Sequence, residues 1–131
     1  MPLVRIDLSA DRSDAAAIAD GIHRALVSAV GIPTGDRFQL ITRHPAGELI
    51  FDADYLGVER RDVIYVQITL VAGRPTERKV ALYRQIADNL AELGVRPEDL
   101  VITLTGTGLD DWSVGNGEAQ LVAQGTVPGL A

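Results

Sequence analysis

The first half of the chain predicts a strand, a helix and two further strands. Apolar residues take every second position from Pro2 to Leu8 (Pro2, Val4, Ile6, Leu8), which indicates a strand with one buried face. Apolar side chains then recur at helical spacing: Ile18, Ile22, Leu26, Ala29 and Val30. Ser13 is the predicted cap of this helix, and Gly31 and Pro33 end it. We expect strands near 37–43 and 48–52, on either side of a turn at residues 44–47.

The second half predicts a similar series. Residues 63–71 are rich in β-branched side chains and apolar on both faces, which predicts a central strand. Thr76 is the predicted cap of a second helix, which ends at Gly94. Its predicted buried stripe consists of Val80, Tyr83, Ile86, Ala87, Leu90 and Leu93. A last strand is expected over 100–105.

Three landmarks recur at one spacing, which indicates a duplicated unit. Ser13 and Thr76, Gly31 and Gly94, and Asp36 and Asp99 are each 63 positions apart. We therefore expect a single domain over residues 1–131 with two β-α-β pseudo-repeats, about 2–61 and 62–125. Two such units predict an α+β two-layer sandwich, a four-stranded sheet with both helices on one face.

The other face of that sheet needs cover. The central strand carries four aliphatic residues that we do not expect to be exposed to water: Ile64, Val66, Ile68 and Leu70. We therefore expect the chain to associate with copies of itself through the sheet.

Composition excludes several classes of protein. The chain has 131 residues, 47% of them hydrophobic, a net charge of −6, no cysteine and two histidines. A metal enzyme is not expected, because His23 and His44 lack ligand spacing; His23 falls in the first helix and His44 in the turn. The negative charge argues against nucleic acid as a partner. No apolar run approaches the ~20 residues that span a bilayer, and no signal peptide is recognised, so a cytoplasmic protein is expected.

Pro2 is the first candidate for chemistry. A small second residue usually lets the initiator methionine be removed, and the mature chain would then begin with a secondary amine. That amine would share a face with buried aliphatic residues, and desolvation favours its neutral form. An amine poised near neutral pH can serve as a general acid or base. The alternative is a frayed, solvated chain end.

Arg74 and Asp36 are the next candidates. Arg74 directly follows the central strand, where its guanidinium could hold a carboxylate through two parallel hydrogen bonds. The alternative for Arg74 is an ordinary surface arginine. Asp36 could orient a water molecule or exchange a proton with the amine. The equivalent position of Asp99 makes a plain turn aspartate an equally good interpretation.

Residues 109–117 form a glycine-flanked loop that holds the chain's single tryptophan, Trp112. An indole in such a loop usually anchors an interface or forms a pocket wall. The loop is not a phosphate-binding loop, because no Gly-Lys-Ser/Thr follows it. The carboxylates Glu48, Asp52, Asp54 and Glu59 are spaced too loosely to form a catalytic pair, and we interpret them as solvated.

Taken together, the Pro2 strand, the two repeats, the segment from Gly31 to Arg37, Arg74-Pro75 and the loop from Asp111 to Gly117 resemble the tautomerase superfamily. They are most similar to its malonate semialdehyde decarboxylase subgroup. The resemblance covers nearly the whole chain and implies a tautomerase/MIF-like fold and a homotrimer. It also implies a catalytic amino-terminal proline in a pocket near subunit boundaries, with no metal and no cofactor.

The same resemblance implies roles for individual residues. Pro2 would exchange protons with, or polarise, a small oxo-carboxylate, Asp36 would assist, and Arg74 would bind the carboxylate. Thr76 and Trp112 are expected beside the substrate. The decarboxylase pattern has a second arginine where this chain has Thr76. The missing cation argues against decarboxylation of malonate semialdehyde and leaves keto–enol tautomerisation open.

Two further functions fit the same sequence features. Water addition of the hydratase or dehalogenase type would need Asp36 beside Pro2 to activate a water molecule. A non-catalytic trimeric binding protein on the same fold would be favoured if the mature protein kept Met1.

Overall fold

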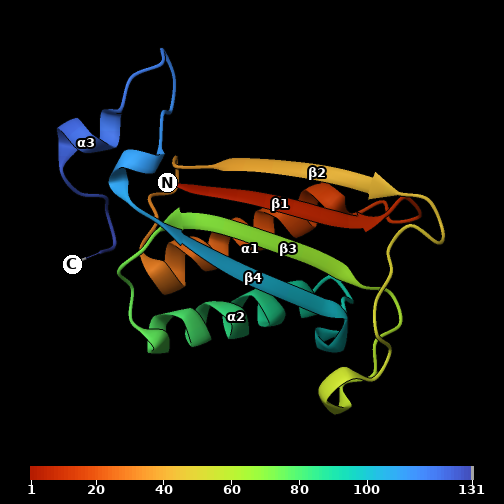
Figure 1. Cartoon of the computed structure of the whole chain (residues 1–131). Helices are drawn as coiled ribbons and strands as arrows, with labels where there is room; N and C mark the ends of the chain where they lie inside the picture. The colour runs from red at the N-terminus through yellow and green to blue at the C-terminus, as the bar shows by residue number, and fades with distance from the viewer. Residues whose placement is uncertain (131) are drawn as a thin grey trace.

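The computed structural model describes residues 1–130, which form a sheet layer and a helix layer (Figure 1). The main elements are β1 (Pro2–Ser9), α1 (Ala15–Val30), β2 (Phe38–His44), β3 (Ile64–Val71), α2 (Thr76–Ala91) and β4 (Leu100–Thr107). Four shorter helical elements lie in the connections and near the C-terminus: η1 (Tyr55–Gly57), η2 (Pro97–Asp99), η3 (Leu109–Asp111) and α3 (Gln120–Gln124).

The sheet confirms the predicted pair of β-α-β units. Its strand order is β2-β1-β3-β4. Within each unit the two strands are parallel, β1 with β2 and β3 with β4, and the units meet where β1 and β3 run antiparallel. β3 is a central strand, as predicted, and α1 and α2 both cover the same face of the sheet (Figure 1).

The core lies between the sheet and the two helices. The side chains of Val4, Ile6 and Leu8 from β1 are at most 1% exposed there. The helices contribute Ile18, Ile22, Leu26, Leu82, Ile86 and Leu90. Burying an aliphatic side chain of this size stabilises the fold by roughly 1.5–3 kcal/mol. The alternation predicted for the first strand is therefore correct, and Pro2 lies on its buried face.

One step in the argument for self-association was wrong. Ile64, Val66, Ile68 and Leu70 do not face the uncovered side of the sheet, because they pack beneath the chain's own helices and belong to the core. The strand register instead places other side chains on the uncovered face, here called the free face: Leu3, Arg5, Asp7, Phe38, Leu40, Thr42, Tyr65, Gln67 and Thr69. Phe38 and Leu40 are 48% and 46% exposed.

The predicted strand at 48–52 does not form. Residues between β2 and β3 make an extended connection instead, in which η1 is the only regular element that the structure describes. Arg60 organises this connection, because one guanidinium nitrogen donates to the backbone carbonyls of Asp52, Tyr55 and Val58. An arginine therefore satisfies main-chain groups that a neighbouring strand would otherwise have paired.

The helix boundaries and the buried stripe of α2 also differ from the prediction. Asp14 and Pro75 occupy the N-cap positions, so neither Ser13 nor Thr76 is a cap. Val80 of α2 and Leu93 in the turn after it are exposed, whereas Leu82 and Asn89 of α2 are buried. The reason is the contact with α1 at Gly21, whose backbone carbonyl accepts a 2.9 Å hydrogen bond from the Asn89 side chain. A pattern of apolar positions does not predict a buried polar residue that is hydrogen-bonded within the fold.

The predicted glycine stops are confirmed. Gly31 directly follows α1 with φ +74°, and Gly94 ends the turn after α2 with φ +78°. Both glycines take the left-handed conformation that closes a helix end at little steric cost. Within residues 1–130, no helix combines the length and the hydropathy that a bilayer crossing requires.

Candidate active site

The chain's amino end lies at the edge of the core beside Asp36. Pro2 is buried and is paired with Leu70 across the antiparallel β1–β3 ladder. Leu70 is paired in turn with Gly106 of β4, so the three residues form a row across the sheet. The chain described here begins with Met1, and its amino nitrogen lies 3.2 Å from Oδ2 of Asp36.

The Asp36 carboxylate does not form the hydrogen bond that closes its own turn. The turn is closed by its backbone, since the Asp36 N–H donates to the Pro33 carbonyl at 3.0 Å. One carboxylate oxygen contacts the Met1 amine. The other, Oδ1, is buried and has no hydrogen-bond partner within residues 1–130. A buried acceptor without a partner costs roughly 1–3 kcal/mol, so this oxygen is suited to a water molecule or a substrate group.

Arg74 is buried rather than on the surface, with 6% of the residue exposed. It follows Gly73, whose φ is +128°. Three of its nitrogens donate to backbone carbonyls: Nη1 to Val71 at 2.9 Å, Nη2 to Pro128 at 3.3 Å and Nε to Val30 at 3.4 Å. Burial and, next, the neighbouring charge of Arg78 lower the pKa of Arg74. Arg74 thus ties the end of α1 and the C-terminal segment to β3.

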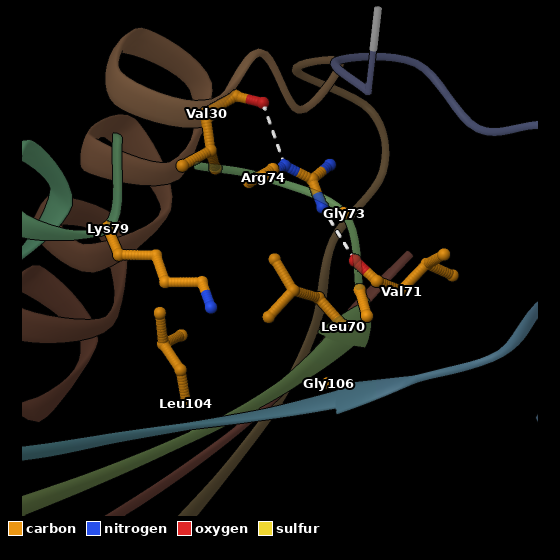
Figure 2. Close-up of a pocket in the computed structure, with 9 residues that line it drawn as sticks. Val30, Leu70, Val71, Gly73, Arg74, Lys79, Leu104 and Gly106 are labelled. Atoms are coloured by element: carbon orange, nitrogen blue, oxygen red, sulfur yellow. Dashed lines mark hydrogen bonds between the residues drawn. The ribbon is translucent and has the colours of Figure 1, made fainter. Parts of the chain in front are cut away.

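Arg74 also lines a small pocket at the carboxyl end of β3 (Figure 2). The pocket encloses about 40 Å³, enough for a few water molecules. Its walls are Val30, Leu70, Val71, Ala72, Gly73, Arg74, Lys79, Leu104 and Gly106. Pro2 is not one of these residues. Its cross-strand neighbour Leu70 stands between it and the pocket, so Pro2 is one strand spacing, about 5 Å, from the wall.

Trp112 lies on the other side of the amino end. Its indole Nε1 donates to Thr107 Oγ1 at 2.7 Å. Its ring joins Met1 in an apolar cluster that includes Val71. Met1 and Trp112 also line a hollow together with Leu3, Phe38, Ser113 and Val114. Val71 belongs to this cluster and also lines the Arg74 pocket, so the two hollows lie at the same end of the sheet.

The structure therefore gathers most of the predicted site residues at one end of the sheet. Pro2, Asp36 and Trp112 surround Met1, and Arg74 lies across Leu70 from them. Thr76 does not join them: it is an exposed residue at the start of α2 and lines neither hollow. Lys79 was missed by the sequence analysis, although its position three residues after Thr76 places it on the same side of the helix.

The two histidines have structural partners. His23 is buried on α1, and its Nε2 lies 2.8 Å from the Thr34 carbonyl. His44 is not in a turn, as predicted, but is the last residue of β2, where its Nε2 lies 2.7 Å from Asp7 Oδ1. Within residues 1–130, no group of three or more histidine, aspartate or glutamate side chains is arranged to hold a metal ion.

Comparison with known proteins gives consistent family matches. Two family models, both described as tautomerase enzyme, match residues 36–115 and 2–59. Probable tautomerase YusQ of Bacillus subtilis (strain 168) is 43% identical over 126 residues, which cover 93% of this chain and 99% of that protein. Probable tautomerase YrdN of the same organism is 34% identical over 125 residues, which cover 93% of this chain and 97% of that protein.

Solved structures extend the similarity to three dimensions. The structure of FG41 malonate semialdehyde decarboxylase inhibited by 3-bromopropiolate has a TM-score of 0.90 and 39% identity, over 96% of this chain and 99% of that one. A second malonate semialdehyde decarboxylase has a TM-score of 0.87 and 31% identity, over 95% and 99% of the two chains. A fused 4-OT trimer, at 23% identity, TM-score 0.75 and coverage of 92% and 98%, shares the fold. The chain belongs to the tautomerase superfamily, in the group of malonate semialdehyde decarboxylase.

Proposed function

We propose that Pro2, freed by removal of Met1, is the acid/base of an enzyme that acts on a small oxo-carboxylate. The observation that carries this proposal is the position of the chain end: the Met1 amine lies 3.2 Å from Asp36 Oδ2, and Pro2 lies one strand from the Arg74 pocket. Removal of Met1 leaves a secondary amine at the head of a buried strand face, one residue after the nitrogen that contacts Asp36. Oδ1 of that carboxylate has no partner among residues 1–130. A general acid or base needs such a position within reach of the reacting atoms.

Each neighbouring residue has a role in this proposal. Asp36 holds the amine and orients it, and Trp112 forms an apolar wall. Arg74 supplies fixed positive charge: a guanidinium has five N–H donors, and backbone carbonyls take three of them, which leaves two for a carboxylate. Thr76 has a smaller role than the other four, because it lies outside the walls of both hollows.

The reaction we propose first is keto–enol tautomerisation of a small 2-oxo acid. The Pro2 nitrogen takes the proton from the enol hydroxyl, the carbonyl forms, and the same proton is delivered to the adjacent carbon. The reaction needs one group that both accepts and donates a proton. Thr76 in place of a second arginine supports this choice, because charge that would hold the amine or the carboxylate is absent at that position.

Decarboxylation of malonate semialdehyde is the second candidate, favoured by the 39% and 31% identity to two decarboxylases. Here protonated Pro2 draws electrons toward the aldehyde oxygen while carbon dioxide leaves, and a proton then returns to the carbon. The second of these relatives is described with decarboxylase and hydratase activities. In a hydration reaction, the unpartnered oxygen of Asp36 would hold the attacking water molecule.

We also propose that the chain forms a homotrimer through its free face. Phe38 and Leu40 expose large apolar side chains there, and structures of fused 4-OT with the same fold are described as trimers. The amino end lies next to this face, because the Met1 hollow includes Leu3 and Phe38.

The test is a parallel assay of phenylenolpyruvate and malonate semialdehyde with the wild-type chain and Pro2→Ala. Mass spectrometry of the native protein should first show that Met1 is absent. Pro2→Ala should lose about 10²–10⁴-fold in kcat on the accepted substrate and keep its circular dichroism spectrum. Full activity in Pro2→Ala would end the proposal, and retained Met1 with neither substrate converted would favour a binding protein.

A further inference from the structure

Lys79 stands apart from the other cations of this chain. It is the single lysine among 12 lysine and arginine residues. It lies on α2, one turn from the start of the helix, and lines the same pocket as Arg74. Figure 2 shows its ammonium group over Leu104, directed into the pocket. Within residues 1–130 the ammonium group makes neither a hydrogen bond nor an ion pair.

The walls of the pocket are unbalanced in charge. They include two cations, Arg74 and Lys79, and no carboxylate, and every other lining residue is apolar or glycine. Positive charge on low-dielectric walls attracts an anion more strongly than the same charge in open water. The pocket therefore suits a small anionic group such as a carboxylate.

The cations nearby differ in their freedom to respond to a ligand. Arg74 is fixed by three backbone carbonyls. Arg78 is fixed too, since it donates to Gly129 at 2.7 Å and to Ala29 at 3.4 Å. Lys79 has a flexible four-carbon stem and three donors, and it is exposed at the mouth of the pocket. Of the three, Lys79 is the cation that can close on an incoming ligand and release it.

We propose that Lys79 is the substrate-positioning cation of this protein and binds the substrate carboxylate opposite Arg74. It places a second positive charge in the Arg74 pocket, three residues after Thr76 on α2. Its role in turnover rests on the proposed function, whereas its binding of a carboxylate does not. The substrate class that follows is a small acid whose carboxylate enters the pocket between Lys79 and Arg74.

The first test compares the steady-state kinetics of Lys79→Met, Lys79→Arg and Arg84→Met. Lys79→Met keeps the stem and removes the charge, so KM should rise about 10–100-fold with a smaller change in kcat. Lys79→Arg should restore most of the loss. Arg84 is a matched control, because it is a cation on the same helix outside this pocket, and its variant should keep the wild-type KM.

The methyl ester of the accepted substrate separates charge recognition from a general loss of function. It lacks the anion, so the wild-type chain and Lys79→Met should convert the ester with equal kcat/KM. An unchanged KM for the acid in Lys79→Met would overturn the proposal. So would equal losses for acid and ester, since these would indicate a structural effect.

A second test works without turnover. Because Lys79 is the single lysine, formaldehyde with cyanoborohydride methylates one ε-amine, which peptide mass mapping separates from the terminal amine. Saturating malonate, which carries no reactive carbonyl, should slow methylation of Lys79 at least fivefold, and this protection should be lost in Arg74→Met. Unprotected Lys79 would overturn the proposal. Protection in a chain whose Pro2→Ala variant is fully active would reject the proposed function and leave the carboxylate site standing.

Discussion

Asp36 and Asp99 occupy equivalent positions in the two repeats and have different roles. Asp99 is 4% exposed, and its Oδ1 accepts hydrogen bonds from the Arg61 backbone at 2.7 Å and from Arg96 at 3.2 Å. Asp36 instead contacts the amino end and keeps one buried oxygen without a partner within residues 1–130. The two equivalent aspartates therefore differ in their contacts: Asp99 holds a loop, and Asp36 contacts the amino end.

This difference predicts opposite outcomes for the same substitution. Asp99→Asn removes the charge that receives two donors and should lower the free energy of unfolding at pH 7 by about 1–3 kcal/mol in urea titrations. Asp36→Asn should change that free energy by less than ~0.5 kcal/mol but lower kcat/KM at least tenfold. Equal destabilisation by both variants would contradict the division of roles.

At this scale, sequence reasoning identified residue types better than their surroundings. Pro2 could be placed on a buried face because strand alternation is a local property. The burial of Arg74 could not be predicted, because its partners Val30 and Pro128 are 44 and 54 residues away in the chain. Lys79 was missed, since a lysine in the first turn of a helix is ordinarily solvated.

The two helix ends show which features of a helix stop can be predicted from the local sequence. Gly31 and Gly94 were predicted correctly as helix stops, and both adopt positive φ. Their environments differ: a Cβ added to Gly31 would lie 3.1 Å from the Gly129 backbone, whereas one added to Gly94 meets nothing within 4 Å. The stop is a property of the local sequence, but the packing against Gly129 depends on the tertiary fold.

Alanine at these two positions separates the two effects. Gly94→Ala should cost about 1–2 kcal/mol of unfolding free energy, the price of a left-handed alanine alone. Gly31→Ala should cost measurably more, because its methyl group also displaces the C-terminal segment, and limited proteolysis should cut that segment faster. Equal losses in urea titrations, without faster cleavage, would show that the contact with Gly129 contributes nothing.

Elements that depend on particular side-chain contacts were predicted least well. The expected strand at 48–52 is absent because Arg60 binds the carbonyls of that connection. The buried face of α2 is rotated because Gly21 lets α1 approach so closely that its missing Cβ would lie 2.9 Å from Leu90. The contact at Gly21 joins residues far apart in the chain, which periodicity does not encode. The Arg60 hydrogen bonds span only 2 to 8 residues, but turn residues do not encode which carbonyls a side chain binds.

For the whole molecule, sequence duplication was enough to predict the layers and the sheet, but not what the free face carries. The predicted oligomer rested on Ile64, Val66, Ile68 and Leu70, which the chain's own helices bury. The proposed trimer now rests on Phe38 and Leu40 of β2, an edge strand of the sheet. Large apolar side chains on an uncovered sheet face are typical of subunit contacts.

A charge introduced on that face tests the assembly. Leu40 is 46% exposed and is paired with Arg5 on the free face, so Leu40→Glu should leave the monomer folded and prevent close packing of a second sheet. Sedimentation should then give a monomer in place of the wild-type trimer. Val80→Glu is the control, because Val80 is 57% exposed on α2 in the helix layer and should remain trimeric. The hollow beside the amino end includes Phe38 of the same face, so kcat should fall together with the trimer. A trimeric Leu40→Glu variant would place the subunit contact elsewhere, and a monomeric wild type would contradict the proposed trimer.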